Sequence, residues 1–404
     1  MSEFQEKVER GRRVTLSEVD GDLVLEGSTV VPVGSSVVVS GTVKVNGRSV
    51  IKGNLKAEEV RGDGDLQVEG DLEADDVKLG NGASLEVGRD LKAEDVDVPN
   101  TLRVGGRTEV EDLRVGGTAV LTGNAKVDDI RVGGTLRAQA KLEASDVKVG
   151  GAVEAVELVC DDVKVGGSLK AGRVDAEDLN VGGTVEIEGE AKLEDVDVGG
   201  TVAMGKGTIG DARVGGTLKA ADDLAFEAMD VGGQILLGSG RGEKISVGGV
   251  LEVRGDLALE EELGVGGRVK IGGALSAEEI SVGGELEASS AVAAEKFDVG
   301  GDLTTAKGAK GELVEIGKRA RVRGPIIGET VKIREKAEAD DIYAGSLWLG
   351  EECSVRNVHT QRAEIGDRCV VSGRFQYTEA IRLGKDVRLS SQPEKVSELP
   401  RPPL

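Results

Sequence analysis

Aromatic residues are scarce in this sequence: Phe, Tyr and Trp together make up 2% of its 404 residues. A globular core of this size normally depends on such large side chains, so their scarcity argues against conventional globular domains. A narrow core filled by Val, Leu, Ile and Ala needs few of them. The composition therefore favours a thin, repetitive body.

Long apolar runs and basic character are also missing. No apolar segment is long enough to span a bilayer, and residues 1–13 lack an apolar core of signal-peptide length, so we expect a cytoplasmic protein. The formal net charge of -23 argues against nucleic acid as a partner and against broad adsorption to an anionic membrane. We expect residues 1–13 to form a flexible tail. The alternative is a local membrane or partner contact, which Phe4 and Val8 beside Arg10, Arg12 and Arg13 would suit.

What the sequence does contain is a repeat. The tripeptide Val-Gly-Gly recurs between Val104 and Gly301, and from Val115 onward its valines are 16 to 18 residues apart. In Asp162–Ala171, apolar and polar residues alternate on either side of the two glycines. Alternation with period two is typical of strands with one buried face, and paired glycines mark a corner. The pattern predicts an all-β fold, a single-stranded parallel β-helix with rungs of about 16–18 residues.

Rungs also precede and follow the regular repeat. Before it, anchors recur at Ile51, Val68, Val87 and Val104, where corners such as Glu69-Gly70 carry a single glycine. After it, a second set of similar sequence repeats begins at Ile316, Ile333, Leu349, Ile365 and Leu383. We therefore expect N-terminal rungs over 14–103, a regular shaft over 104–301 and C-terminal rungs over 302–390. A flexible, proline-containing tail over 391–404 should be unable to join a sheet.

Charged columns are predicted on the outside of the repeat. Aspartate stands three residues before seven consecutive Val-Gly-Gly valines, from Asp112 to Asp211, and a basic residue stands one residue before the first four. On one strand face the basic column should partly neutralise the acidic one. We interpret each Asp as an acceptor for the backbone N–H groups of the preceding corner. The alternative is a cation-binding ladder, but the Gly-Gly-x-Gly-x-Asp calcium pattern does not occur in the repeats.

Three cysteines are too few for a disulfide framework and lack metal-ligand spacing. Cys353 and Cys369 are one rung apart, in a column shared with Ala320, Ala337 and Val387, so this is a small apolar core position. We expect buried free thiols.

Enzyme chemistry finds little support. The stretch Gly238–Lys244 lacks the Gly-Lys-Ser/Thr ending of a phosphate loop. Hexapeptide-repeat acyltransferases depend on histidine, and His359, the only histidine in this sequence, is interpreted as a corner residue. A three-histidine zinc site is excluded by the same count. We predict no enzymatic activity, no cofactor and no nucleotide.

Recognition is expected near the C-terminal end. Trp348 lies between inward Leu347 and Leu349, so it should point outward in a column with Glu315, Lys332, Glu364 and Arg382 as a lateral contact for other proteins. Phe375 and Tyr377 share a face near the last rung.

These rungs and phrases such as Val165–Ala171 resemble the bactofilins, a family of polymer-forming cytoskeletal proteins, over residues 14–389. The resemblance implies a right-handed helix that assembles end to end into filaments without nucleotide. The expected self-assembly residues are Val14, Leu16, Val19, Phe375, Tyr377 and Leu389. The alternative function is a monomeric β-solenoid rod that binds proteins as a spacer or scaffold.

Overall fold

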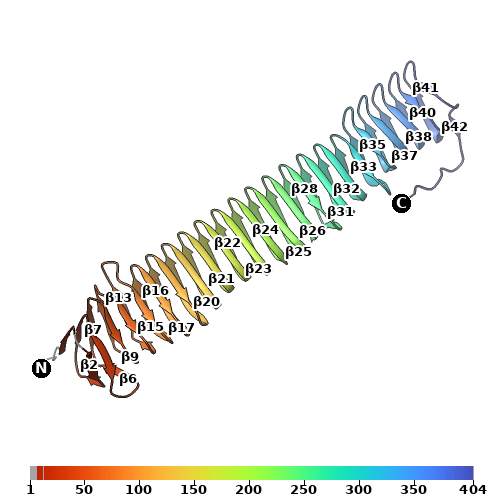
Figure 1. The fold of residues 1–404 in the computed structure, drawn as a ribbon. Coiled ribbons are helices and arrows are strands. Elements are labelled where there is room, and N and C mark those ends of the chain that lie inside the picture. The colour runs from red at the N-terminus through yellow and green to blue at the C-terminus, as the bar shows by residue number, and fades with distance from the viewer. Residues whose placement is uncertain (1–6, 12, 404) are drawn as a thin grey trace. The chain divides into compact units, whose positions relative to one another are not determined.

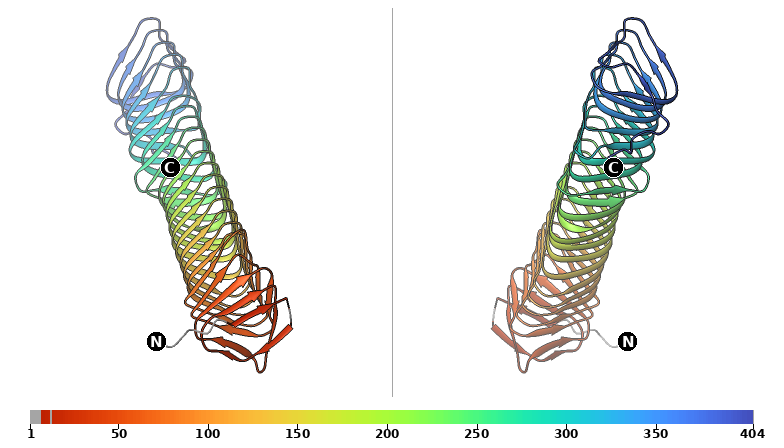
Figure 2. Two further views of the ribbon diagram at one scale, coloured as in Figure 1. Left: turned by 90° about the vertical axis from the view of Figure 1, so that its left-hand side faces the viewer. Right: turned by 90° about the vertical axis from the view of Figure 1, so that its right-hand side faces the viewer.

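The structure of the protein is a computed structural model that describes residues 7–11 and 13–403. The described residues form β-strands and no helix. The chain divides into two units, Met1–Gly200 and Thr201–Leu404, which are described separately. Figure 1 labels several strands of each unit, and Figure 2 gives two further views.

The first unit is a parallel β-solenoid whose turns, or rungs, each have three faces. Each strand pairs in parallel with the strand one rung earlier and one rung later, as in the series Val43, Val60 and Val77. The prediction of a parallel β-solenoid is confirmed.

In the first rungs each face has its own strand. Face 1 contains β1 (Lys7–Arg10), β4 (Leu23–Glu26), β7 (Thr42–Asn46), β10 (Glu59–Gly62) and β13 (Asp76–Leu79). Face 2 contains β2 (Arg13–Leu16), β5 (Thr29–Pro32), β8 (Ser49–Ile51), β11 (Leu66–Val68), β14 (Leu85–Val87), β16 (Thr101–Val104) and β18 (Thr118–Leu121). Face 3 contains β3 (Glu18–Val19), β6 (Ser36–Val39), β9 (Asn54–Lys56) and β12 (Leu72–Glu73).

Later strands continue around the bends between faces. Faces 3 and 1 merge in β15 (Leu91–Val98), β17 (Thr108–Val115) and β19 (Ala125–Val132). All three faces merge in β20 (Thr135–Val149), β21 (Ala152–Val165), β22 (Ser168–Val181) and β23 (Thr184–Val198).

The alternating apolar residues fill the core of each rung. Leu113 and Val115 are 0% and 2% exposed, and Ile130 and Val132 stack on them in register. Burial of each such side chain contributes about 1.5–3 kcal/mol, so the aliphatic columns replace the missing aromatic core.

The Val-Gly-Gly corners lie between face 1 and face 2, and crowding explains their glycines. A Cβ on Gly133 would lie 2.2 Å from the carbonyl oxygen of Gly116, its counterpart one rung earlier. Both glycines have ordinary negative φ, because neither is among the residues with positive φ. The missing side chain is therefore required by close stacking.

The register corrects one part of the repeat analysis. Val104 stacks on Val87 and under Leu121 on face 2, whereas Val115 stacks under Val132 on face 1. The first Val-Gly-Gly is thus a corner between faces 2 and 3, of the same kind as Glu69-Gly70, which explains its odd spacing from the rest.

The second unit is also a parallel β-solenoid. Four strands cover all three faces: β24 (Thr201–Val214), β25 (Thr217–Val231), β31 (Arg268–Val282) and β32 (Glu285–Val299). Between them lie β26 (Gln234–Gly242), β27 (Lys244–Val247), β28 (Val250–Val253), β29 (Leu257–Leu259) and β30 (Glu262–Val265). Gly242 packs against Phe226, where a Cβ would meet the ring at 2.3 Å, so the glycines that resemble a phosphate loop make room for this ring.

The C-terminal rungs continue the same three faces. They comprise β33 (Leu303–Thr305), β34 (Ala309–Ile316), β35 (Arg321–Arg323), β36 (Ile326–Ile333), β37 (Glu338–Leu349), β38 (Ser354–Ile365), β39 (Val370–Val371), β40 (Phe375–Leu383), β41 (Arg388–Leu389) and β42 (Glu394–Lys395). The predicted column from Ile316 to Leu383 is confirmed.

The C-terminal corners differ from the Val-Gly-Gly corners in their backbone conformation. Each places a non-glycine residue in the left-handed region, with φ between 56° and 64°: Arg319, Lys336, Glu352, Arg368 and Asp386. One residue with positive φ per corner supplies the bend, at a modest cost in strain.

Candidate functional site

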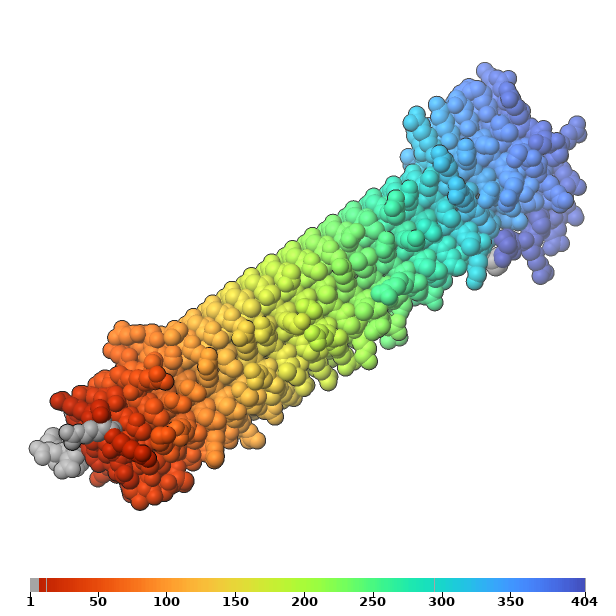
Figure 3. Space-filling model, in the orientation of Figure 1, coloured from red at the N-terminus to blue at the C-terminus, as the bar shows by residue number. Residues whose placement is uncertain are grey.

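The last turn exposes apolar side chains that earlier turns bury. Leu383 is 40% exposed, whereas Ile365, one rung earlier in the same column, is 2% exposed. Ile381 and Leu389 are half-buried above Ala363 and Val371, which are buried. We call Ile381, Leu383, Val387 and Leu389 the terminal apolar face. Figure 3 shows the last turns in blue at one end of the second unit.

The strand edges at this end are also open. Among the described residues, Ala380–Leu383 of β40 pair only with β38, and β41 pairs only with β39. The outer backbone N–H and C=O groups of these strands therefore lack a strand partner, which makes the edge a template for another strand.

The C-terminal tail covers part of this end, contrary to the prediction that it cannot join a sheet. Glu394 and Lys395 form β42, which pairs with Gln376 and Tyr377, and the Val396 N–H donates to the Tyr377 carbonyl oxygen at 2.9 Å. Pro393 stands just before this short strand, where its missing N–H breaks no ladder bond.

Phe375 and Tyr377, which were expected to contact another copy, are largely covered in the structure. Phe375 is 1% exposed and fills the core above Val358, and Tyr377 is half-buried above Thr360. Of the C-terminal residues predicted for self-assembly, Leu389 is the one on the terminal apolar face.

At the N-terminal end, part of the expected tail is ordered. Lys7–Arg10 form β1, which pairs in parallel with β4. Residues 1–6 and 12 of the predicted tail, Phe4 among them, lie outside the described part of the chain. Val8 is 45% exposed on the outside of β1.

Charged residues cap face 1 at this end. Lys7 stacks on Leu23 and Glu9 on Leu25, and the two charged side chains lie 3.7 Å apart. On the other faces Val14 is half-buried, and Leu16 and Val19 are each 5% exposed. The N-terminal end is thus more polar and better covered than the terminal apolar face.

Trp348 points outward as predicted and is 41% exposed. Its column contains Glu315, Lys332, Glu364 and Arg382, in the expected order. The indole borders a shallow depression of about 510 Å³ that Arg362 and Ile381 also line. Lys332 pairs with Glu315 at 3.0 Å, so the charges around the indole are partly compensated.

The neighbouring bases partly neutralise the acidic column on face 1, as predicted, because each of its first four aspartates forms an ion pair with the base two residues later. Asp112 accepts hydrogen bonds from Arg114 at 3.1 Å and Arg131 at 3.4 Å. A hydrogen bond from Lys148 lowers the pKa of Asp146. Each such exposed pair contributes between zero and about 1 kcal/mol.

The prediction that these aspartates accept backbone N–H groups of the preceding corners is wrong. That role belongs to carboxylates at other corners, such as Asp71, which accepts the Asp90 N–H at 3.2 Å, and Asp90, which accepts the Arg107 N–H at 2.8 Å. The column aspartates lie within strands, where backbone donors are already paired. Asp211 lies in the second unit, beside Ala228.

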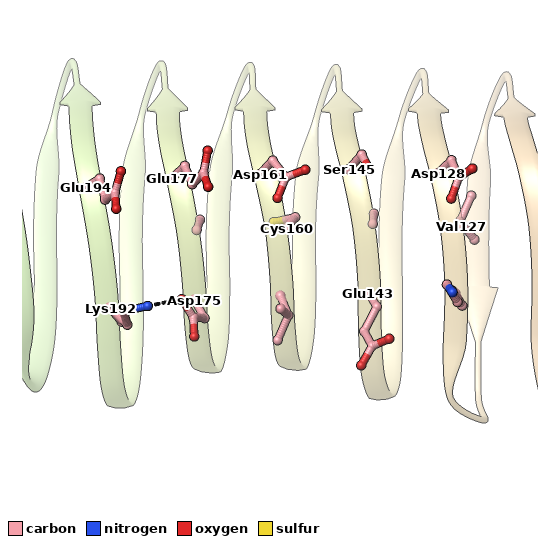
Figure 4. A pocket seen from close by; sticks show the side chains of 14 residues that line it. Val127, Asp128, Glu143, Ser145, Cys160, Asp161, Asp175, Glu177, Lys192 and Glu194 are labelled. Carbon is pink, nitrogen blue, oxygen red and sulfur yellow. Dashed lines mark ion pairs between the residues drawn. The ribbon is translucent and has the colours of Figure 1, made fainter.

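A groove on face 3 of the first unit was not anticipated. Its floor is formed by the small side chains of Ala144, Cys160 and Ala176, and its volume is about 370 Å³. Figure 4 shows Asp161 and Glu177 in a row along one side. Burial and neighbouring aspartates raise the pKa of Cys160 to about 12, so the thiol is unreactive there.

Two of the acidic side chains that line this groove are held in ion pairs, Glu143 with Lys141 and Asp175 with Lys192 at 3.6 Å. Small residues at one core position of consecutive rungs were the sequence signal for the groove.

His359 lies inside β38 and not at a corner as predicted. Its ring stacks on Tyr343 with centroids 4.9 Å apart, Nδ1 lies 3.0 Å from Gln376 Oε1, and the residue is 7% exposed. Burial lowers the pKa of the imidazole. The side chain completes a polar stack on face 3.

Cys353 and Cys369 are buried free thiols, as expected, and Ala320 and Ala337 in the same column are buried as well. Among the residues that the structure describes, no cluster of three or more His, Cys, Asp and Glu side chains could hold a metal ion. Nor does any helix in the described ranges have the length and apolar character to cross a bilayer.

No protein-family profile, curated protein or solved structure matches this chain.

Proposed function

We propose that this chain is a non-enzymatic, bactofilin-like cytoskeletal scaffold that self-assembles end to end into filaments without nucleotide. The observation that carries the proposal is the terminal apolar face: Leu383 is 40% exposed at a position that is 2% exposed one rung earlier. A second copy placed over this face would restore the burial that every interior rung has.

Backbone groups support the same contact. The free edges of β40 and β41 would gain hydrogen bonds from strands of another copy, and each apolar side chain that becomes fully buried would contribute up to about 1.5–3 kcal/mol. Such gains must exceed the entropic cost of association, which continuous burial of aliphatic columns is suited to do.

The N-terminal end would supply the second contact of a filament. Val14 is half-buried there, Leu16 and Val19 are each only 5% exposed, and the Lys7–Glu9 pair on face 1 would limit how closely another end approaches. The C-terminal contact should therefore be the stronger one. The proposal places the scaffold in the cytoplasm, where Val8 and its basic neighbours would provide any membrane contact.

Electron microscopy and sedimentation without nucleotide test the proposal. Leu383→Glu combined with Leu389→Glu places charge in the contact and should abolish filaments. Arg382→Glu adds the same negative charge beside it on an exposed side chain and should leave filaments intact. Isolated rods from the unmodified chain at every protein concentration would refute self-assembly.

The second candidate is a monomeric rod that binds other proteins through its side. The exposed Trp348 in its depression favours this function, because an indole with one free face is a common anchor at interfaces. Under this alternative, Trp348→Ala abolishes partner capture, whereas the Leu383 and Leu389 variants leave the assembly state unchanged.

A further inference from the structure

Two cysteines occupy adjacent rungs near the C-terminal end. Cys353 follows Glu352 and Cys369 follows Arg368, so each thiol stands directly after the left-handed residue of its corner. The Val370 N–H donates to the Cys353 carbonyl oxygen at 2.8 Å, and Ser354 stacks on Val370. The two cysteines are therefore direct neighbours in one column.

Their spacing suits a disulfide. Neighbouring parallel strands lie about 4.8 Å apart, and disulfides join residues whose Cα atoms are about 4.4–6.8 Å apart. The Cys353 thiol donates to the Arg334 carbonyl oxygen at 3.1 Å, and the Cys369 thiol donates to that of Gly350 at 3.0 Å. Both side chains thus take the same orientation, with one sulfur above the other.

The two thiols differ in acidity. The interaction between the two neighbouring sulfurs lowers the pKa of Cys369, and the same interaction together with burial raises the pKa of Cys353. Cys369 is therefore the more acidic of the two thiols, and thiolates are the form that peroxides oxidise.

The position near the end of the solenoid provides access. Both cysteines are buried, but only the last turn covers Cys369, through the half-buried Val387 and the Arg388 N–H that donates to the Cys369 carbonyl oxygen. Terminal rungs of a solenoid open most readily because they have a neighbour on one side only.

We propose that Cys353 and Cys369 form a peroxide-sensitive pair that closes into a disulfide between adjacent rungs. Cys369 is the attacking thiol and Cys353 the resolving thiol. Hydrogen peroxide is the oxidant, because it is small enough to pass one opened rung.

The chemistry balances in two steps. The Cys369 thiolate attacks one peroxide oxygen, the O–O bond breaks, and the products are a sulfenic acid and hydroxide. The Cys353 sulfur then attacks the sulfenic sulfur, the S–O bond breaks, and water leaves with the thiol proton. In total, two thiols and one peroxide give one disulfide and two waters.

The test treats the full chain with hydrogen peroxide at neutral pH, followed by thiol counting in denaturant and peptide mapping. We expect the count to fall from three free thiols to one, with a crosslinked peptide pair that contains Cys353 and Cys369. Both thiols should disappear at least about tenfold faster than that of Cys160, whose pKa is raised to about 12.

Single variants identify the roles. Cys353→Ala should stop the reaction at a sulfenic acid on Cys369 that a dimedone probe traps, and Ala337 at the equivalent position indicates that the fold accepts alanine. Cys160→Ala should leave the crosslink unchanged. Survival of all three thiols, equal loss of Cys160, or crosslinks between chains would each overturn the proposal.

Discussion

A methyl group at one Val-Gly-Gly corner tests the physical account of the repeat. A Cβ on Gly150 would lie 2.4 Å from the Gly133 carbonyl oxygen, about 1 Å closer than ordinary contact. The corner can move away only by lengthening backbone hydrogen bonds to the preceding rung, chiefly Gly150 N–H to the Val132 carbonyl oxygen at 2.9 Å and Gly151 N–H to that of Gly134 at 3.0 Å.

The magnitude follows from these contacts. Forcing one methyl group into close packing costs about 1–3 kcal/mol, and each weakened backbone hydrogen bond loses up to about 0.5–1.5 kcal/mol. Gly150→Ala should therefore lower the free energy of unfolding by about 2–5 kcal/mol.

Urea unfolding followed by circular dichroism measures this change, and Gly34→Ala is the matched control. Gly34 is also a corner glycine, but nothing lies within 4 Å of its Cβ position and its φ is not positive. Alanine there should be neutral or stabilising by up to about 1 kcal/mol, because it restricts the unfolded chain. Equal stability of the two variants would refute crowding as the reason for the repeat.

Two further predictions concern protonation. The Asp341 carboxylate accepts two hydrogen bonds from Arg356 at 2.9 Å, and these bonds hold its pKa below the usual range. The ionised carboxylate therefore stabilises the fold at pH values above the usual carboxyl pKa, and this contribution is lost as pH falls through the lowered pKa. Asp341→Asn should lower the free energy of unfolding by about 1–3 kcal/mol at pH 7 and by less in acid, measured by urea unfolding at both pH values. For His359, burial favours the neutral imidazole, so stability should fall as pH drops below about 6.5, and His359→Gln should flatten the pH dependence of the urea midpoint between pH 7 and 5.

The stacked rungs explain why much of this fold follows from the sequence. When every rung lies in register on the last, residues one period apart become neighbours, so spacing alone places Trp348 between Lys332 and Glu364 and Cys369 next to Cys353. The same logic predicted that bases on the same face would partly neutralise the acidic column, as Lys148 does for Asp146.

The features that spacing could not predict depend on where the chain turns. Val104 carries the repeat motif but belongs to face 2, because a corner motif does not specify which corner it occupies. The groove over Cys160 required knowledge of which core positions share a face.

The ends of the chain are the second place where the sequence repeat fails to predict the structure, because the periodicity stops there. Lys7 and Glu9 occupy positions that are apolar in later rungs, and no repeat unit indicates that they continue the core column. Glu394 and Lys395 extend face 3 although the surrounding prolines are typical of a tail. A short strand survives there because it needs partners on one side only.

The contrast between the sides and the ends of the solenoid supports end-to-end contact over lateral contact. Along the sides of each unit, strand edges are paired rung to rung and the side chains carry most of the net charge of -23, so two copies side by side would repel each other. At the terminal apolar face the backbone edge is open and Leu383 is exposed. Raising the salt concentration screens the repulsion between sides but strengthens apolar burial. End contacts should therefore persist in high salt, whereas assembly through pairs such as Lys332–Glu315 would weaken there.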